Sequence, residues 1–172
     1  KKRSEYVQLI ESVYQFAVGD DSLGLGVGNQ MRRVLEAFST FCYRKSIEDV
    51  SCDSNVLAQL GQYADYFENR MYRLILHGES HYEEQVYNFH DSLDFYEFFS
   101  TDEKRETAKD ILCFMYLLNK AHIKAYLPKA DNHLQQWCAD IRKNMTSQAD
   151  KGLQTTSKKI VKLCDLPLSA GC

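Results

Sequence analysis

One apolar stripe in residues 29–44 constrains the fold more than any other feature of the sequence. At 100° per residue, its apolar side chains fall on one face of a helix: Met31, Val34, Leu35, Phe38, Phe41 and Cys42. A strand would instead alternate apolar and polar residues. The segment therefore predicts an amphipathic helix with one buried face.

The rest of the chain divides into further helices and their connections. The same periodicity predicts helices over residues 4–18, 55–76, 101–126 and, less regularly, 131–144. Ser100-Thr101-Asp102-Glu103 is a capping box that opens one of them, and Leu127-Pro128 ends it. Residues 19–28 and 45–54 are expected to be connections, and residues 79–99 an irregular excursion with one short helix.

The scarcity of turn-forming residues supports an all-helical fold. The chain has 172 residues with only 8 Gly and 2 Pro, whereas a sheet protein of this size needs many tight turns. The prediction is an all-α bundle of four to five helices over residues 1–128. Residues 129–172 are expected to add one weak helix and a polar, less ordered C-terminal tail.

Charge and cysteine usage exclude several classes of protein. The formal net charge of −3 gives no general attraction to nucleic acid or anionic lipid. No run of 18 apolar residues and no apolar signal-peptide segment occurs, so no membrane partner is expected. The six cysteines are scattered, which indicates reduced thiols in a cytoplasmic protein and no zinc-ligand spacing.

A phosphate-binding loop is also not expected. The glycines between Gly24 and Gly28 precede a helix, but no strand is predicted before them and no Gly-Lys-Ser/Thr follows. We therefore expect no cofactor and no metal on this chain.

Polar residues on the second predicted helix form the first candidate site. Asn29, Arg32 and Glu36 lie opposite the apolar stripe, and Arg32 and Glu36 are one helical turn apart. An exposed salt bridge worth a few tenths of a kcal/mol explains this pair on its own. The pair indicates a functional site only if further catalytic residues lie close to it.

A second polar group lies at the end of the third predicted helix. Arg70, Arg73 and His77 share its polar side, and His81 follows just beyond Gly78. If the second and third helices pack antiparallel, this end approaches Arg32. Convergence of Arg, Glu and His indicates a site, whereas each histidine alone is adequately explained as a surface residue.

Two segments then resemble a known family. Asn29-Gln30-Met31-Arg32-Arg33-Val34-Leu35-Glu36-Ala37-Phe38, followed later by Ser80-His81, resembles the C-terminal helical domain of a bacterial ATPase family that includes the anticodon nucleases. Residues 110–126 resemble the closing helix of these domains. The resemblance covers about residues 5–127. These domains are similar to the HEPN class of helical ribonucleases, whose active residues follow the pattern Arg-x-x-x-Glu…His.

The resemblance implies roles for individual residues. Arg32, Glu36 and His81 would form the catalytic set, and Asn29, Arg70 and Arg73 would bind substrate. His77 stands where the family pattern has an Asn. Arg70-x6-His77 also resembles the Arg-x4-6-His motif of HEPN domains, but with Met71 in place of the usual polar residue. Both histidines therefore remain candidates for the acting residue.

The resemblance also implies partners. The chain would be the effector domain of a defence-associated ATPase, it would form a homodimer, and RNA, in particular tRNA, would be its substrate. The ATPase portion, with its ATP and Mg²⁺, would lie on a longer parent chain, in keeping with the missing initiator Met before Lys1. The alternative is a non-catalytic helical dimerisation or sensing lobe in which the Arg32–Glu36 pair is structural.

Overall fold

The chain is all-α throughout the part that the structure covers. The structure is a computed structural model that describes residues 4–71 and 99–164, with side chains for all of these except 23–25 and 148–164. Across those residues it contains helices and no strand, which confirms the predicted fold class. The elements are α1 (Glu5–Ala17), η1 (Asp21–Gly26), α2 (Val27–Tyr43), α3 (Ile47–Cys52), α4 (Ser54–Ala58), η2 (Gly61–Tyr63), α5 (Ala64–Met71), α7 (Thr101–Leu118), α8 (Lys120–Tyr126) and α9 (Asp131–Cys164).

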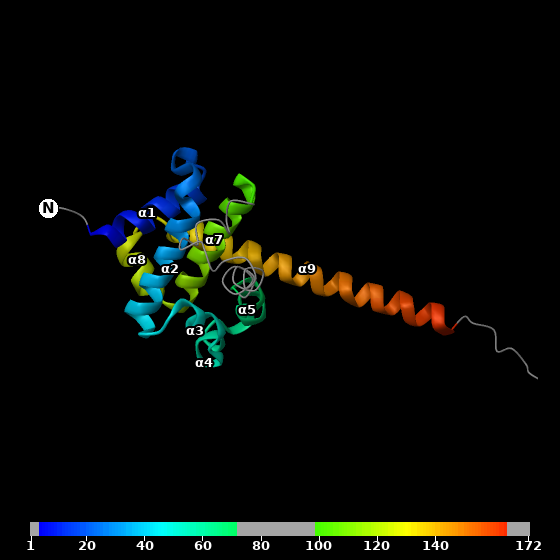
Figure 1. Ribbon diagram of the computed structural model, residues 1–172. Coiled ribbons are helices and arrows are strands. Elements are labelled where there is room, and N and C mark those ends of the chain that lie inside the picture. The colour runs from blue at the N-terminus through cyan, green and yellow to red at the C-terminus, as the bar shows by residue number, and fades with distance from the viewer. Residues whose placement is uncertain (1–3, 72–98, 165–172) are drawn as a thin grey trace, which may run out of the picture. The chain divides into compact units, whose positions relative to one another are not determined.

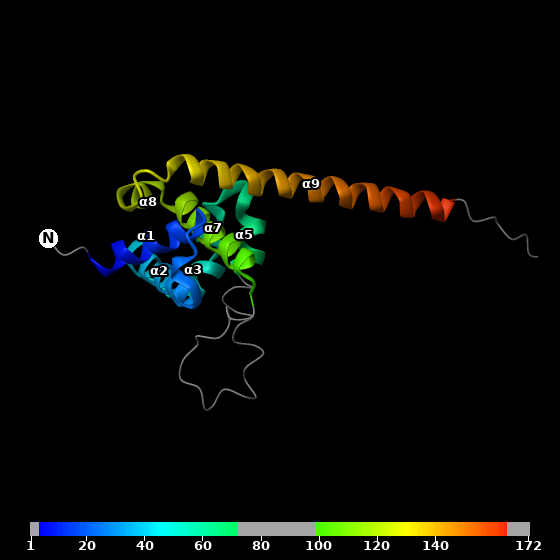
Figure 2. The same ribbon diagram turned by 90° about the horizontal axis from the view of Figure 1, so that it is seen from above.

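The residues divide into two compact units, 1–137 and 138–172. The first unit contains all the described helices from α1 to α8 together with the first residues of α9, and the second contains the remainder of α9. In the first unit, α1, α2 and α7 pack against one another (Figure 1). The short helices α3, α4 and α5 follow α2, and α3 contacts both α2 and α5 (Figure 2).

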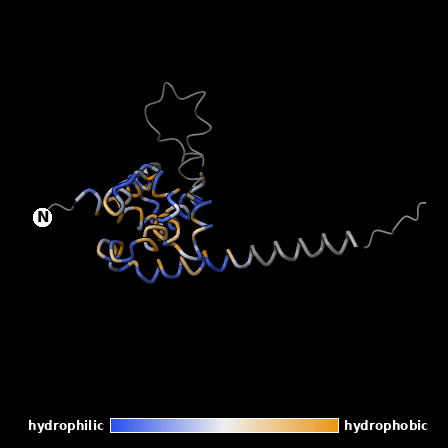
Figure 3. Tube along the Cα trace, turned by 90° about the horizontal axis from the view of Figure 1, so that it is seen from below, coloured by the Kyte–Doolittle hydropathy of each residue, from blue (hydrophilic) through white to orange (hydrophobic). Residues whose placement is uncertain are grey.

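The core of the first unit comes from the apolar faces that the sequence predicts. Its hydrophobic segments gather in the interior (Figure 3). The largest fully buried side chains are Phe16, Phe38, Phe67, Phe114, Ile10, Met31, Leu35, Met71, Ile111, Leu112, Met115 and Ile123. Burying each such side chain contributes about 1.5–3 kcal/mol, so these faces supply the main driving force for folding.

Phe41 is the exception on the α2 stripe, since it is 63% exposed. At 100° per residue it lies about 80° from Met31, at the edge of the stripe. The end of α2 thus places an aromatic ring at the surface, where it contacts the Tyr6 ring edge-on at 5.6 Å between centroids.

The third predicted helix, residues 55–76, is wrong as a single element. Residues 54–71 form α4, η2 and α5 instead, and Gly61, the first residue of η2, has φ +56°. That backbone angle cannot continue an α-helix, and glycine adopts it without strain. Residues 45–54 are also not a plain connection, because α3 begins there: Ser46 accepts a hydrogen bond from the Asp49 backbone N–H at 3.0 Å.

The helix predicted over residues 101–126 begins as expected and then divides. The capping box of Ser100 and Glu103 is confirmed. At Asn119 the backbone turns to φ −148°, ψ 79°, which separates α7 from α8. The Asn119 side chain then caps α8 by accepting a hydrogen bond from the His122 backbone N–H at 3.0 Å. Asparagine competes well for this position because its side chain satisfies an otherwise unpaired backbone donor.

Two segments contain more helix than the sequence predicts. Residues 21–26 of the predicted loop form the 3₁₀ helix η1, capped by Asp20. The weak helix predicted over residues 131–144 begins at Asp131 and continues to Cys164, through residues assigned above to a tail. No proline interrupts the segment between Asp131 and Pro167, so its helix-forming residues extend the helix despite Gly152.

Candidate functional site

The Arg32–Glu36 pair predicted from the sequence forms on α2. The Nε of Arg32 donates a hydrogen bond to Oε1 of Glu36 at 2.8 Å, and the side chains are 36% and 44% exposed. The spacing of four residues places both side chains on one helix face. The pair is accessible, and its carboxylate fixes the orientation of the guanidinium.

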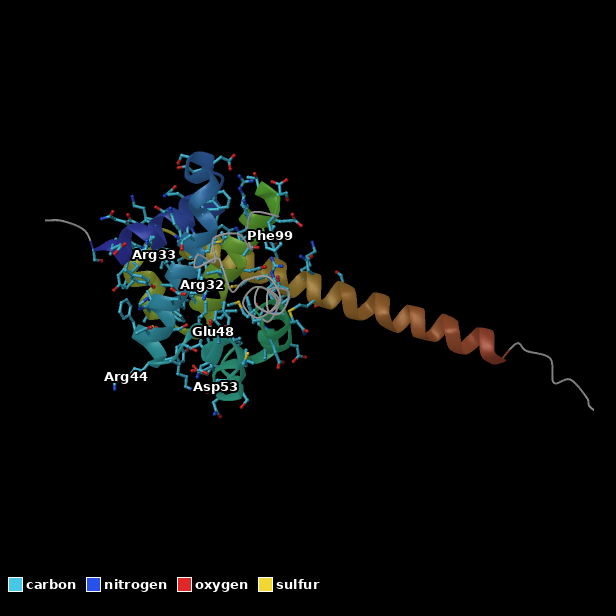
Figure 4. All side chains as sticks on the ribbon, in the orientation of Figure 1. Arg32, Arg33, Arg44, Glu48, Asp53 and Phe99 are labelled. Atoms are coloured by element: carbon cyan, nitrogen blue, oxygen red, sulfur yellow. The ribbon has the colours of Figure 1, made fainter. Side chains whose placement is uncertain are left out.

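A third residue, Glu48, joins this pair. Its Oε1 lies 3.8 Å from Nη2 of Arg32. Figure 4 shows Arg32 and Glu48 close together on the face toward the viewer, one from α2 and the other from α3. The guanidinium of Arg32 thus lies between two carboxylates, which attract it and compete with any anionic ligand.

Glu48 was not among the predicted site residues, because residues 45–54 were expected to be a connection. A local signal was present: Ser46 is followed by Asp49 three residues later, with the apolar Ile47 and Val50 one turn apart. In the structure Ile47 and Val50 are buried, which turns Glu48 toward α2.

Asn29 lies on the first turn of α2 and is exposed. It stands one helical turn before Arg32, so both residues are reachable from the same side of the helix. The predicted substrate-binding role of Asn29 is compatible with this exposure and stays a prediction.

Arg70 has protein partners. Its Nε donates a hydrogen bond to Oδ2 of Asp110 at 2.7 Å, and its Nη2 donates one to Oγ1 of Thr107 at 3.2 Å. The hydroxyl of Tyr66 donates to Oδ1 of Asp110 at 2.9 Å. This network joins α5 to α7, so the structure gives Arg70 a structural role, and its substrate-binding role stays a prediction.

Burial dominates the electrostatics of this network. It raises the pKa of the Asp110 carboxyl, although Arg70 and Tyr66 oppose that change. It also raises the pKa of the Tyr66 hydroxyl, and the nearby Asp110 charge adds to the effect. The Tyr66 hydroxyl therefore stays protonated and acts as a donor.

The remaining predicted site residues, Arg73, His77 and His81, lie outside the described residues. The expected approach of Arg32 to the end of the third predicted helix falls on the same undescribed residues and stays a prediction. Among the described helices, α2 contacts α1, α3 and α7. Arg32 is consequently joined to α3 through Glu48.

A groove elsewhere on the first unit is not part of this site. It has a volume of about 720 Å³ and lies between α1 and residues 126–130. Gln8, Glu11 and Gln15 of α1 line it, together with Lys129. Neither Arg32 nor Glu36 borders it.

The residues described show neither a metal site nor a membrane span. Among them, no three His, Cys, Asp or Glu side chains are grouped closely enough to hold a metal ion. Their helices include none that is both long and apolar enough to cross a membrane. Cys42, Cys52, Cys113 and Cys138 form no disulfide.

Comparison of the chain with protein-family models, with curated proteins and with solved structures found no significant match.

Proposed function

We propose that the chain is the helical effector domain of a metal-independent ribonuclease of the HEPN type. The observation that carries the proposal is the hydrogen-bonded Arg32–Glu36 pair on an accessible face of α2. Its spacing matches the Arg-x-x-x-Glu part of the family pattern, and the Arg32 side chain is half-exposed. A guanidinium in this setting is suited to a phosphate, because its planar fork matches two phosphate oxygens.

The proposed reaction is transesterification within RNA. The 2′-oxygen attacks the adjacent phosphorus, the bond from phosphorus to the 5′-oxygen breaks, and a 2′,3′-cyclic phosphate and a 5′-hydroxyl end result. One group removes the 2′ proton and another protonates the leaving 5′-oxygen. Histidine performs such transfers near neutral pH, which is the role assigned to His81, with His77 as the other candidate.

Arg32 and Glu36 have complementary roles in this proposal. Arg32 binds the phosphate and stabilises the negative charge that develops on it in the transition state. Glu36 holds the guanidinium in place through the 2.8 Å hydrogen bond. Asn29, one turn earlier and exposed, extends the same surface toward the RNA backbone.

The second candidate is a non-catalytic dimerisation or sensing lobe. The position of Arg32 between Glu36 and Glu48 favours it, because two carboxylates can satisfy the guanidinium without a ligand. The two candidates differ in whether Arg32 is needed for a chemical step or only for a helix-to-helix contact.

The decisive experiment is RNA cleavage by the purified chain in EDTA. Total tRNA is incubated with wild type, Arg32→Ala, His81→Ala and the matched control Arg33→Ala. Arg33 is the next residue on α2, with a 44% exposed side chain that pairs with Glu5. Circular dichroism verifies that each variant is folded, and the RNA ends are analysed for cyclic phosphate.

The proposal expects cleavage that is lost in Arg32→Ala and His81→Ala and retained in Arg33→Ala. The loss is expected to be about 100-fold or more in each, as for removal of a general acid–base group in His81→Ala and of a group that stabilises transition-state charge in Arg32→Ala. Absence of cleavage by folded wild type would refute the ribonuclease proposal in favour of the interaction lobe. Equal loss in Arg33→Ala would show that only the net positive charge of this surface matters.

A further inference from the structure

A second group of polar side chains lies at the other end of α2 and takes no part in the proposed function. Cys42 from α2, His122 from α8, Tyr6 from α1 and Asn119 between α7 and α8 meet there. Tyr6, Cys42 and the neighbouring Asn119 and His122 come from three distant parts of the sequence, so only the packing of the helices brings them together. A thiol, an imidazole and an amide in contact are the residue types of cysteine-based nucleophilic chemistry.

The geometry connects these groups in a chain. Sγ of Cys42 lies 3.7 Å from Nδ1 of His122 and 3.7 Å from Nδ2 of Asn119. The other ring nitrogen, Nε2, lies 2.8 Å from the Tyr6 hydroxyl. Asn119 also accepts the His122 backbone N–H at 3.0 Å. Both ring nitrogens are therefore engaged, which fixes the imidazole with one nitrogen facing the sulfur.

The environment holds this pair in its uncharged form. Burial raises the pKa of the Cys42 thiol, and the hydrogen bond from Asn119 opposes that change. Burial lowers the pKa of the His122 imidazole. At neutral pH a thiol therefore faces an unprotonated imidazole, which can accept its proton when the sulfur attacks. The nearby titratable groups are Tyr6 from α1, Tyr43 from α2 and Tyr126 from α8.

The surroundings of the pair are aromatic. The His122 ring has its centroid 5.4 Å from that of Phe38, 5.7 Å from that of Tyr6 and 4.8 Å from that of Tyr126. Phe41, which precedes Cys42, is 63% exposed and also contacts Tyr6. Cys42 and His122 are themselves half-buried. Flat aromatic walls of this kind suit an uncharged, planar ligand, which stacks on rings and carries no charge to desolvate.

We propose that Cys42 is a nucleophilic modification site for uncharged conjugated electrophiles, the α,β-unsaturated carbonyl compounds, with His122 as its general base. The sulfur attacks the β carbon, a carbon–sulfur bond forms and the carbon–carbon π bond breaks. The thiol proton passes to Nδ1 of His122 and then to the α carbon of the resulting enolate. The reaction is an addition, so nothing leaves and nothing is oxidised or reduced.

Cys52 provides a control within the same chain. It is exposed and therefore easier to reach than Cys42. Burial of its sulfur raises its pKa, and the carboxylates of Glu68, Asp49 and Glu48 raise it further, so its thiolate is disfavoured. Exposure alone would make Cys52 the faster thiol, whereas assistance by His122 would make Cys42 faster.

The test measures the rate of modification at each cysteine in the whole chain. The protein is treated at pH 7 with N-phenylmaleimide, a planar conjugated carbonyl compound, and peptide mass spectrometry follows Cys42 and Cys52 in the same sample. Wild type is compared with His122→Gln and with Tyr6→Phe, which keeps the ring and removes only the hydroxyl. Circular dichroism verifies that both variants are folded.

Cys42 is expected to react faster than Cys52, and His122→Gln to slow Cys42 by about tenfold or more without changing Cys52. Tyr6→Phe is expected to slow Cys42 by a smaller factor. Between pH 7 and 8 the Cys42 rate should change by less than about twofold. The Cys52 rate should rise about tenfold, because only its free thiolate reacts.

Two results would overturn the proposal. One is a Cys42 rate no greater than that of Cys52. The other is a Cys42 rate that neither His122→Gln nor Tyr6→Phe changes in folded protein. Because the readout is covalent modification and not RNA cleavage, failure here is distinct from failure of the proposed ribonuclease function.

Discussion

The Nε of Arg70 donates a hydrogen bond to Oδ2 of Asp110 at 2.7 Å, across an interval of 40 residues. The contact joins the end of α5 to the middle of α7. Residues 72–98, which include His77 and His81, connect these two helices along the chain. The Arg70–Asp110 pair therefore holds together α5 and α7, the helices that precede and follow this segment in the sequence.

Breaking this pair should destabilise the fold strongly. The Asp110 side chain is only 8% exposed, so Arg70→Met leaves a buried carboxylate without its cation. We expect the free energy of unfolding to fall by about 3–5 kcal/mol, measured by urea denaturation.

Arg33→Met is the matched control, since it removes an exposed ion pair with Glu5 and should cost at most about 1 kcal/mol. Equal losses in the two variants would contradict the structural role assigned to Arg70.

Removing Glu48 should make Arg32 more available to an anion. In Glu48→Gln the guanidinium keeps Glu36 at 2.8 Å and loses the second carboxylate at 3.8 Å. If Arg32 binds the RNA phosphate, the affinity for tRNA should rise, by about two- to tenfold at low salt, because one competing charge is gone. Fluorescence anisotropy with labelled tRNA measures this affinity. Weaker binding by folded Glu48→Gln would argue that Arg32 does not face the phosphate.

The bend at Gly61 should be strained by substitution with alanine. A Cβ at Gly61 would meet nothing within 4 Å, so the cost of Gly61→Ala comes only from its backbone angle, φ +56°. We expect a loss of about 1 kcal/mol in thermal or urea unfolding.

Gly26→Ala is the control at an ordinary helical angle, where the new methyl would lie 4.0 Å from Nε2 of Gln30. It should be neutral or slightly stabilising. A neutral Gly61→Ala would show that the α4–η2–α5 bend is not fixed by this backbone conformation.

The capping box at the start of α7 should make stability depend on pH in the acid range. The backbone N–H and the hydroxyl of Ser100 hold the pKa of Glu103 below its ordinary value of 4.5. A carboxyl whose pKa is lower in the folded state stabilises that state above its unfolded pKa, and loses this contribution as the pH falls through the folded value.

The difference in unfolding free energy between wild type and Glu103→Gln should therefore be largest near pH 7 and shrink below pH 4.5. Urea denaturation at several pH values measures it. Glu106→Gln, which removes a carboxylate from the same helix outside the capping box, corrects for the general loss of one negative charge. Parallel curves for wild type and Glu103→Gln would contradict the prediction.

Local patterns in the sequence predicted the helices well where one buried face repeats without interruption. Ile10, Met31, Leu35 and Ile111 are buried as their helical spacing indicates. The capping box at Ser100 was also predictable, because it depends only on residues three positions apart.

The interruptions were not predictable in the same way. The break at Asn119 and the bend at Gly61 occur inside apolar patterns that continue across them. Tertiary packing overrides the local helical preference at such points. The continuation of α9 to Cys164 shows the opposite error, in which a weak apolar pattern concealed a helix.

The candidate sites show the same difference between contacts within one helix and contacts between helices. The sequence by itself determined the Arg32–Glu36 pair, since one turn of α-helix places residues four apart side by side. Only the tertiary structure decided that Glu48 joins Arg32, that Asp110 holds Arg70, and that Cys42 meets His122. These contacts join residues from different helices, and helix packing depends on all the buried faces together, which no local pattern encodes.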